Sequence, residues 1–201
     1  MRLIDQVHQR AVHPRRARRL SGWLALLLPE AARVVDVGCG DGLVTSLIAQ
    51  ARPDVAIEGV DVLVREGAPV PVRRFDGRRL PYGDRAVDAV LFVDTLHHTD
   101  DPRLLLREAR RVARRAIVIK DHTLDGWLAG PTLRFMDRVG NARHGVALPY
   151  VYWPKQRWLA AFAELGLRVD RWIPRLGLYP WPASALFDRS LQFIARLDVP
   201  S

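Results

Sequence analysis

An apolar stretch that ends in three alternating glycines constrains this chain more than any other feature. Residues 34–42 read Val-Val-Asp-Val-Gly-Cys-Gly-Asp-Gly, so an expected strand runs directly into Gly38, Gly40 and Gly42. Glycine admits positive φ values and has no Cβ, so such a turn can reverse into a helix while a ligand approaches its backbone. Residues 43–49 supply that helix. The order of strand, glycine turn and helix predicts a nucleotide-binding α/β unit.

A carboxylate follows the next expected strand. Residues 55–60 read as that strand and end on Asp61, at the distance of roughly 20 residues past the glycines where nucleotide-binding folds place a ribose ligand. The dinucleotide motif of oxidoreductases needs its third glycine at position 43, which is Leu43. A nicotinamide-dependent oxidoreductase is therefore the weaker alternative.

Asp36 and the three glycines resemble motif I of the class I S-adenosylmethionine (SAM) dependent methyltransferases. Residues 80–102 resemble the fourth-strand region of the small-molecule, methyltransferase type 11-like branch, and the resemblance covers residues 30–120. It implies SAM as cofactor and S-adenosylhomocysteine as product, with Asp36 near the methionine amino group, Asp76 on the adenine and Asp94 toward the methionine end. The cofactor-binding residues that this resemblance implies are Asp36, Gly38, Cys39, Gly40, Gly42, Asp61, Val62, Asp76, Gly77, Val93 and Asp94.

Stretches rich in Val and Ile alternate with helical patterns, which is typical of a parallel sheet with helices on both faces. We expect an α/β fold of Rossmann-like, doubly wound type with a mostly parallel seven-stranded sheet. The link at 62–69 is too short for a helix of ordinary length, which would leave the cofactor pocket more open there. Strands are expected at 33–37, 55–60, 70–75, 87–93, 115–120, 167–173 and 190–197, and helices at 43–50, 101–113, 122–138 and 154–165.

The length of 201 residues fits one domain. We divide it into an N-terminal helical segment (1–29), a cofactor-binding core (30–120) and an acceptor-side segment with the last strands (121–201). No apolar run approaches the roughly 20 residues of a membrane span. The first residues lack the basic-then-apolar order of a signal peptide, and the single cysteine cannot form an internal disulfide. These features predict a cytoplasmic protein. The net charge of +9 comes mainly from arginines that are spread along the chain. We interpret the arginine cluster at 15–19 as a solvated helix face rather than an anion-binding patch.

Methyl transfer needs a general base only where the acceptor must lose a proton. His97 and His98 follow the fourth expected strand, at the edge where open α/β sheets bind ligands. Together with His144 they are the candidate catalytic bases, and a structural role is the alternative. His122, which Asp121 could orient, is a further candidate. Nothing near Cys39 in sequence lowers its pKa, so we expect packing rather than nucleophilic chemistry, and no Cys or His spacing predicts a metal site.

Aromatic residues concentrate after residue 120, which indicates either core packing or a pocket for an apolar acceptor. We expect methyl transfer to a small, apolar or aromatic metabolite of quinone, polyketide or lipid type. RNA methylation is the alternative that the charge suggests, although Val93-Asp94-Thr95-Leu96 stands where a base-methylation motif would lie. A non-catalytic SAM-binding scaffold is a third reading. Peripheral membrane contact and the oligomeric state stay open.

Overall fold

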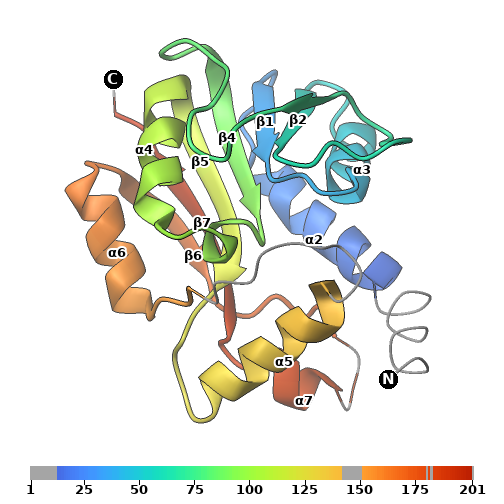
Figure 1. The fold of residues 1–201 in the computed structure, drawn as a ribbon, viewed down its shortest axis with the longest axis vertical. Helices are drawn as coiled ribbons and strands as arrows, with labels where there is room; N and C mark the ends of the chain where they lie inside the picture. Colours follow the sequence, from blue (N-terminus) through green and yellow to red (C-terminus); the bar gives the residue numbers. More distant parts are fainter. Residues whose placement is uncertain (1–12, 142–150, 180, 182, 201) are drawn as a thin grey trace.

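The computed structural model describes residues 13–141, 151–179, 181 and 183–200, which fold around one seven-stranded sheet (Figure 1). The strand order is β3-β2-β1-β4-β5-β7-β6, and β7 runs antiparallel to both of its neighbours. The predicted fold class is confirmed. The strands are β1 (Arg33–Val37), β2 (Ala56–Asp61), β3 (Val72–Arg74), β4 (Val87–Val93), β5 (Ala113–His122), β6 (Arg168–Ile173) and β7 (Gln192–Asp198).

Apolar side chains of the central strands alternate between the two faces of the sheet, because successive residues in a strand point to opposite sides. In β4, Ala89 and Leu91 pack on one face, whereas Val90 and Phe92 pack on the other. All four side chains are fully buried. Strands buried on both faces read as continuous apolar runs, which explains the sequence pattern of β1, β4 and β5.

Two helices cover each face of the sheet. Leu20, Leu24 and Ile48 are fully buried on the first face, and Leu106 and Phe162 are fully buried on the second. The helices of the first layer are α2 (His13–Leu27) and α3 (Leu43–Ala51), and those of the second layer are α4 (Pro102–Val112) and α6 (Lys155–Glu164).

Two further helices, α5 (Ala129–Asn141) and α7 (Ala183–Phe187), lie at the end of the sheet to which the arrowheads of β4 and β5 point (Figure 1). The expected helix at 122–138 is wrong at its start. Strand β5 continues through Asp121 and His122, because both residues pair with β7. Local periodicity does not reveal a pairing with a strand near the C-terminus. The extension carries two ionisable groups to the carboxyl edge of the sheet.

Residues 62–71 link β2 to β3 without a helix, as their length predicts. They form turns and bends, and the exposed side chains of Val62, Leu63 and Val64 follow the end of β2. Within the described residues, no helix has the length and apolar character needed to cross a membrane.

The aromatic side chains of the C-terminal part divide between core and surface. Trp153 and Trp158 are fully buried, and their ring centroids lie 4.8 Å apart. Trp158 Nε1 donates a hydrogen bond of 3.1 Å to the carbonyl oxygen of His122. Trp127 and Trp181 are 80% and 84% exposed. Core packing therefore accounts for part of the aromatic cluster and leaves two tryptophans on the surface.

Gly59 in β2 gives the glycine turn room to pack. A Cβ at Gly59 would lie 2.4 Å from Cys39 Sγ and 3.1 Å from Cys39 Cβ, inside van der Waals contact. We expect Gly59→Ala to lower the free energy of unfolding by about 1–3 kcal/mol, as overpacking does, in urea denaturation. Gly83→Ala is the matched control, because a Cβ there meets no atom within 4 Å. Equal stability of the two variants would contradict the close contact, and partial recovery in a Cys39→Ala background would support it.

Candidate active site

The glycine turn connects β1 to α3 at the carboxyl edge of the sheet. Gly38, Gly40 and Gly42 have φ values of 74°, 61° and 75°, in the left-handed region that favours glycine. The carbonyl oxygen of Gly42 accepts a hydrogen bond of 2.9 Å from the Ser46 N–H and starts α3. A Cβ at Gly40 would meet no atom within 4 Å. The turn is therefore open to a ligand at Gly40.

Thr95, which follows β4, holds the glycine turn from the other side. Its hydroxyl donates a hydrogen bond of 2.9 Å to the Val37 carbonyl oxygen. A Cβ at Gly38 would lie 2.4 Å from Thr95 Cγ2. The loops after β1 and β4 thus approach closely only because Gly38 has no side chain.

Asp61, at the end of β2, directs its carboxylate toward the turn. Oδ2 accepts a hydrogen bond of 2.9 Å from the Gly40 N–H, and Oδ1 accepts one of 2.9 Å from the Leu63 N–H. Each carboxylate oxygen has a second lone pair that can accept a hydrogen bond from a ligand hydroxyl. The ribose contact stays a prediction, and removing Asp61 would also disturb the turn.

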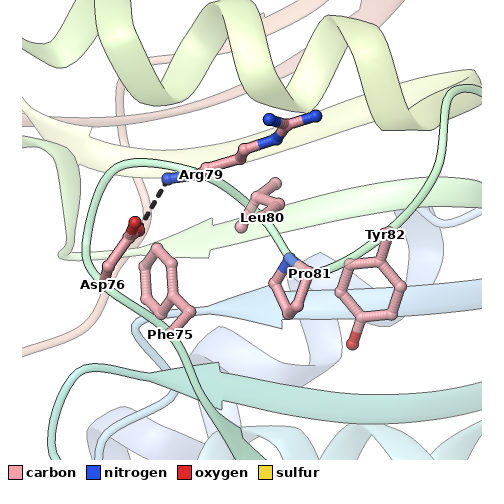
Figure 2. A pocket seen from close by; sticks show the side chains of 6 residues that line it. All are labelled: Phe75, Asp76, Arg79, Leu80, Pro81 and Tyr82. Carbon is pink, nitrogen blue, oxygen red and sulfur yellow. Dashed lines mark hydrogen bonds between the residues drawn. The ribbon is translucent and has the colours of Figure 1, made fainter.

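Asp76 follows β3 and closes a turn with its own carboxylate. Oδ1 accepts hydrogen bonds from the backbone N–H groups of Arg79 (2.7 Å) and Arg78 (2.8 Å), which hold the pKa of Asp76 below its ordinary value. The adenine contact of Asp76 stays a prediction. Figure 2 shows this carboxylate on the wall of an open pocket of about 470 Å³, lined by Phe75, Asp76, Arg79, Leu80, Pro81 and Tyr82.

Val62, Gly77 and Val93 complete the expected cofactor-binding residues at this edge. A Cβ at Gly77 would lie 3.2 Å from Val62 Cγ1, so the loops after β2 and β3 adjoin. Val62 is half exposed, whereas Val93 at the end of β4 packs partly into the core under α2 and α3. Their contacts with a cofactor stay predictions.

Asp36 is a carboxylate buried in β1, just before the turn. Oδ2 accepts a hydrogen bond of 2.6 Å from the Thr45 hydroxyl of α3, whereas Oδ1 is buried with no hydrogen-bond partner among the described residues. Burial is the main cause that raises the pKa of Asp36 to about 7; the Thr45 bond opposes it and the Asp61 charge adds to it. The unpartnered oxygen is suited to a cationic ligand group.

Cys39 packs inside the turn with its sulfur toward Gly59. Burial, and then the charges of Asp36 and Asp61, raise the pKa of the Cys39 thiol above its ordinary value. A thiol that stays protonated is a poor nucleophile. The geometry therefore agrees with the packing role expected for this side chain.

Asp94 lies directly after β4, with a left-handed φ of 54°. Its carboxylate pairs with the Arg16 guanidinium of α2 and with the Lys120 ammonium of β5, and His122 Nε2 lies 3.4 Å from its Oδ1. We call Arg16, Asp94 and Lys120 the ion cluster. The interpretation of the arginine run as a solvated face is wrong for Arg16, whereas Arg15, Arg18 and Arg19 are exposed.

Burial and neighbouring charges oppose each other in the ion cluster. Burial would raise the pKa of Asp94, but Lys120 and Arg16 hold it well below its ordinary value. Burial lowers the pKa of Lys120 to about 8, although Asp94 favours the charged form. Burial, with Lys120 adding to it, lowers the pKa of His122 to about 3. At pH 7 the cluster therefore holds two cations and one carboxylate beside a neutral imidazole.

His97 and Asp121 form a buried pair next to the ion cluster. His97 Nδ1 lies 2.7 Å from Asp121 Oδ1, and the side chains are 1% and 0% exposed. Although burial opposes ionisation, His97 holds the pKa of Asp121 below its ordinary value. The carboxylate also accepts hydrogen bonds from the N–H groups of Leu96 (3.0 Å) and His122 (2.7 Å). An ionised carboxylate only accepts hydrogen bonds, so the proton between the two side chains lies on His97 Nδ1.

Other rings surround His97, which lies in the short 3₁₀ helix η2 (Leu96–His98). The ring centroids of His98, His122 and Tyr152 lie 4.0, 4.8 and 5.7 Å from the His97 centroid. The Asp121 side chain faces the His97 ring rather than the His122 ring that sequence adjacency suggested. The candidate base His144 lies outside the described residues.

Comparison with known proteins agrees with this geometry. Residues 35–117 match the family model described as "Methyltransferase domain". A curated relative, the 27-O-demethylrifamycin SV methyltransferase of Amycolatopsis mediterranei (strain S699), is 32% identical over 111 residues, which are 48% of this chain and 40% of the relative. The chain thus matches less than half of the length of that relative.

Solved structures share the whole fold. The methyltransferase found in complex with the Haloferax volcanii Trm112 methyltransferase activator superposes with a TM-score of 0.70 at 16% identity, covering 98% of both chains. A SAM-dependent methyltransferase from Aquifex aeolicus gives 0.64 at 18% identity, also over 98% of both chains. Residues 35–117 therefore form a methyltransferase domain, within a chain whose whole fold is that of these solved structures.

SAM is the cofactor that a methyltransferase domain implies, and residues of this chain fit it. The space at Gly40 would admit a ligand against the backbone, and the unpartnered Asp36 Oδ1 would accept from an ammonium group. Asp61 ends β2 and Asp76 follows β3, at the same edge of the sheet as the turn. The individual contacts of these residues with SAM stay predictions.

Sequence reasoning missed three residues of the candidate site: Arg16, Thr95 and Lys120. Lys120 carried a signal, because it is one of only two lysines in the chain and directly follows an apolar run. Arg16 carried none that distinguishes it from its neighbouring arginines. The contact of Thr95 with the turn depends on the pairing of β1 with β4.

Gly40→Val should remove S-adenosylhomocysteine binding, because the branched side chain fills the open space of the turn. Isothermal titration calorimetry should show an affinity at least about tenfold weaker, which corresponds to a loss of about 1.4 kcal/mol of binding free energy. Gly166→Val is the matched control: its φ of 66° imposes similar strain, but it precedes β6 at the opposite edge of the sheet. Equal affinities of the two variants would reject the assigned pocket.

Asp36→Asn should stabilise the ligand-free protein at pH 8 by on the order of a few kcal/mol. The folded carboxyl keeps its proton up to about pH 7, whereas the unfolded chain releases it near pH 3.9. The wild type therefore loses stability as the pH rises through this window, and the variant does not. Chemical denaturation from pH 4 to pH 8 measures the difference, which should shrink toward pH 4. Parallel pH curves would contradict the raised pKa.

Proposed function

We propose that this chain transfers a methyl group from SAM to a hydroxyl oxygen of a small, apolar molecule of quinone, polyketide or lipid type. The buried His97–Asp121 pair is the observation that carries the proposal. A hydroxyl must lose its proton as it is methylated, and a positioned general base contributes about 10²–10⁴-fold to such a step. Amine acceptors that arrive unprotonated need no such pair.

The backbone supports the location of this pair. Thr95 bonds to Val37 at the glycine turn, and η2 begins one residue later. The Leu96 N–H in turn donates to Asp121 on β5. The base and its carboxylate are therefore tied through backbone to the loop that would hold the cofactor.

Bound SAM supplies a methyl group on a sulfonium sulfur, which leaves as a neutral thioether. In the proposed reaction His97 Nε2 accepts the hydroxyl proton while the acceptor oxygen forms its bond to the methyl carbon. Asp121 stabilises the resulting imidazolium through the Nδ1–H and does not itself take the proton. Burial of both side chains keeps water away from the transfer.

An apolar acceptor is supported by the helices at the carboxyl edge. Trp127, Leu128 and Phe135 are exposed in and before α5, and Trp181 and Leu186 are exposed around α7. Exposed apolar side chains near a site are typical of binding surfaces for apolar molecules. The name of the Amycolatopsis relative, whose substrate is a small molecule, supports the same class.

His97→Asn should lower kcat by about 10²–10⁴-fold, the usual contribution of a general base, and leave the affinity for S-adenosylhomocysteine unchanged. Transfer of radiolabel from SAM to a panel of hydroxylated naphthoquinones and polyketides is the measurement. Asp121→Asn should lower kcat and also shift the pH dependence of kcat, because the amide fixes the wrong tautomer of His97.

His98→Asn is the matched comparison, since its ring adjoins His97, with the two ring centroids 4.0 Å apart. A large loss in His98→Asn with an active His97→Asn would assign the base to His98. Label in RNA transcripts, but in none of the small molecules, would overturn the proposed acceptor class.

A further inference from the structure

Exposed apolar side chains gather on α5 and α7, the two helices beyond the carboxyl edge of the sheet (Figure 1). The ring of Phe135 in α5 stacks on that of Phe187 in α7, with the two centroids 6.4 Å apart and the ring planes 9° apart. The two helices therefore share one apolar surface. Its exposed members lie in these helices or just before them, and we call them the α5–α7 surface: Trp127, Leu128, Phe135, Trp181 and Leu186.

The chemistry of these side chains favours lipid. Single exposed apolar residues are ordinary on protein surfaces, whereas a group that includes two tryptophans indicates an interaction surface. An indole ring has an apolar body and a polar N–H, which suits the boundary between water and hydrocarbon. Leu128 and Leu186 add aliphatic side chains, which gain contacts in lipid but do not stack on nucleic-acid bases.

Exposed arginines border the α5–α7 surface. Arg134 lies in α5, and Arg175 lies in the segment that leads to α7. Helix α2 packs against the same segment, because Trp23 Nε1 donates a hydrogen bond of 3.2 Å to the Leu176 carbonyl oxygen. That helix adds three further exposed arginines, which are Arg15, Arg18 and Arg19.

The acidic side chains of this region are already engaged. Asp188 accepts hydrogen bonds from the backbone N–H groups of Leu178 (3.1 Å) and Tyr179 (3.0 Å). Asp125 accepts one of 2.9 Å from the Lys155 N–H. These two are the only acids within residues 124–136 and 175–190. The border of the α5–α7 surface is therefore positively charged.

This positive border disfavours a second copy of the chain as the occupant. Two copies that met through the α5–α7 surface would bring their arginines together, and facing like charges weaken an interface. An anionic partner gains from the same charges.

We infer that the α5–α7 surface docks on an anionic lipid bilayer: its aromatic rings enter the boundary between headgroups and acyl chains, and the bordering arginines face the lipid phosphates. Apolar burial and attraction to anionic lipids add together in such binding. Docking would turn the carboxyl edge of the sheet, with the candidate site, toward the bilayer. The binding does not depend on methyl transfer, so it is tested separately from the proposed function.

Sedimentation with vesicles tests this inference. One set of vesicles contains phosphatidylcholine alone, and the other contains equal parts of phosphatidylcholine and phosphatidylglycerol. The protein should bind the anionic vesicles at least about tenfold more tightly, as a few arginines near an anionic surface imply, and added salt should weaken this binding. Tryptophan emission should shift to shorter wavelength on binding, and the shift should be smaller in Trp181→Ser.

Two identical substitutions separate the α5–α7 surface from net charge. Leu186→Glu should weaken binding to the anionic vesicles at least about tenfold, because it removes an apolar contact and places a carboxylate against the headgroups. Leu26→Glu should stay within about twofold of the wild type. Leu26 is also exposed, but it lies near the end of α2 that leads to the start of β1, at the opposite edge of the sheet.

A second matched pair tests the arginines. Arg134→Gln combined with Arg175→Gln should reduce the preference for anionic vesicles several-fold, as the loss of two basic residues near the headgroups implies. Arg107→Gln combined with Arg110→Gln removes the same charge from exposed positions of α4 and should keep the preference. Thermal unfolding should show all these variants folded, because each replaced side chain is exposed.

Equal binding to the two kinds of vesicle, or no binding to the anionic ones, would overturn the inference. Equal losses in Leu186→Glu and Leu26→Glu would overturn it as well, since they would assign binding to net charge alone. A wild-type dimer that Leu186→Glu converts to a monomer in sedimentation equilibrium, with no vesicle binding, would assign the surface to a second copy of the chain.

Discussion

Strands β1 and β4 lie side by side and run parallel, yet the chain leaves them toward opposite faces of the sheet, into α3 and α4. Loops that diverge in this way open a crevice at the carboxyl edge, where open α/β sheets bind ligands. The Thr95 hydroxyl bond to Val37 ties the two loops together. The glycine turn follows β1 at this edge, and Asp94 and His97 follow β4.

Strand β5 adds the ionic part of the site. It carries Lys120, Asp121 and His122 to the same edge in three consecutive buried positions. Buried charges are costly unless they are paired, and even paired ones contribute little to stability. Arg16 and Asp94 supply the pairing, and burial shifts the pKa values of Lys120 and His122 downward. A group of buried ionisable residues with perturbed pKa values at this edge is more typical of a functional site than of a stabilising one.

Much of the fold could be predicted, because strands buried on both faces leave a continuous apolar signal. The glycine turn and the acids after β2 and β3 could be placed for the same reason, since they directly follow such strands. The start of the helix after β5 could not, because β5 is extended by antiparallel pairing with β7. The inward position of Arg16 could not either, since its neighbours in the run share its local sequence pattern.

The sequence by itself determined the alternation of strands and helices and the positive-φ turn at Gly38, Gly40 and Gly42. These features are local, because each depends on residue type and spacing within a few residues. The tertiary structure alone decided that Asp121 faces His97 and that Asp94 gathers Arg16 and Lys120. Those contacts join α2, β4 and β5 across the sheet, and side chains so far apart in sequence meet only once the strand order exists.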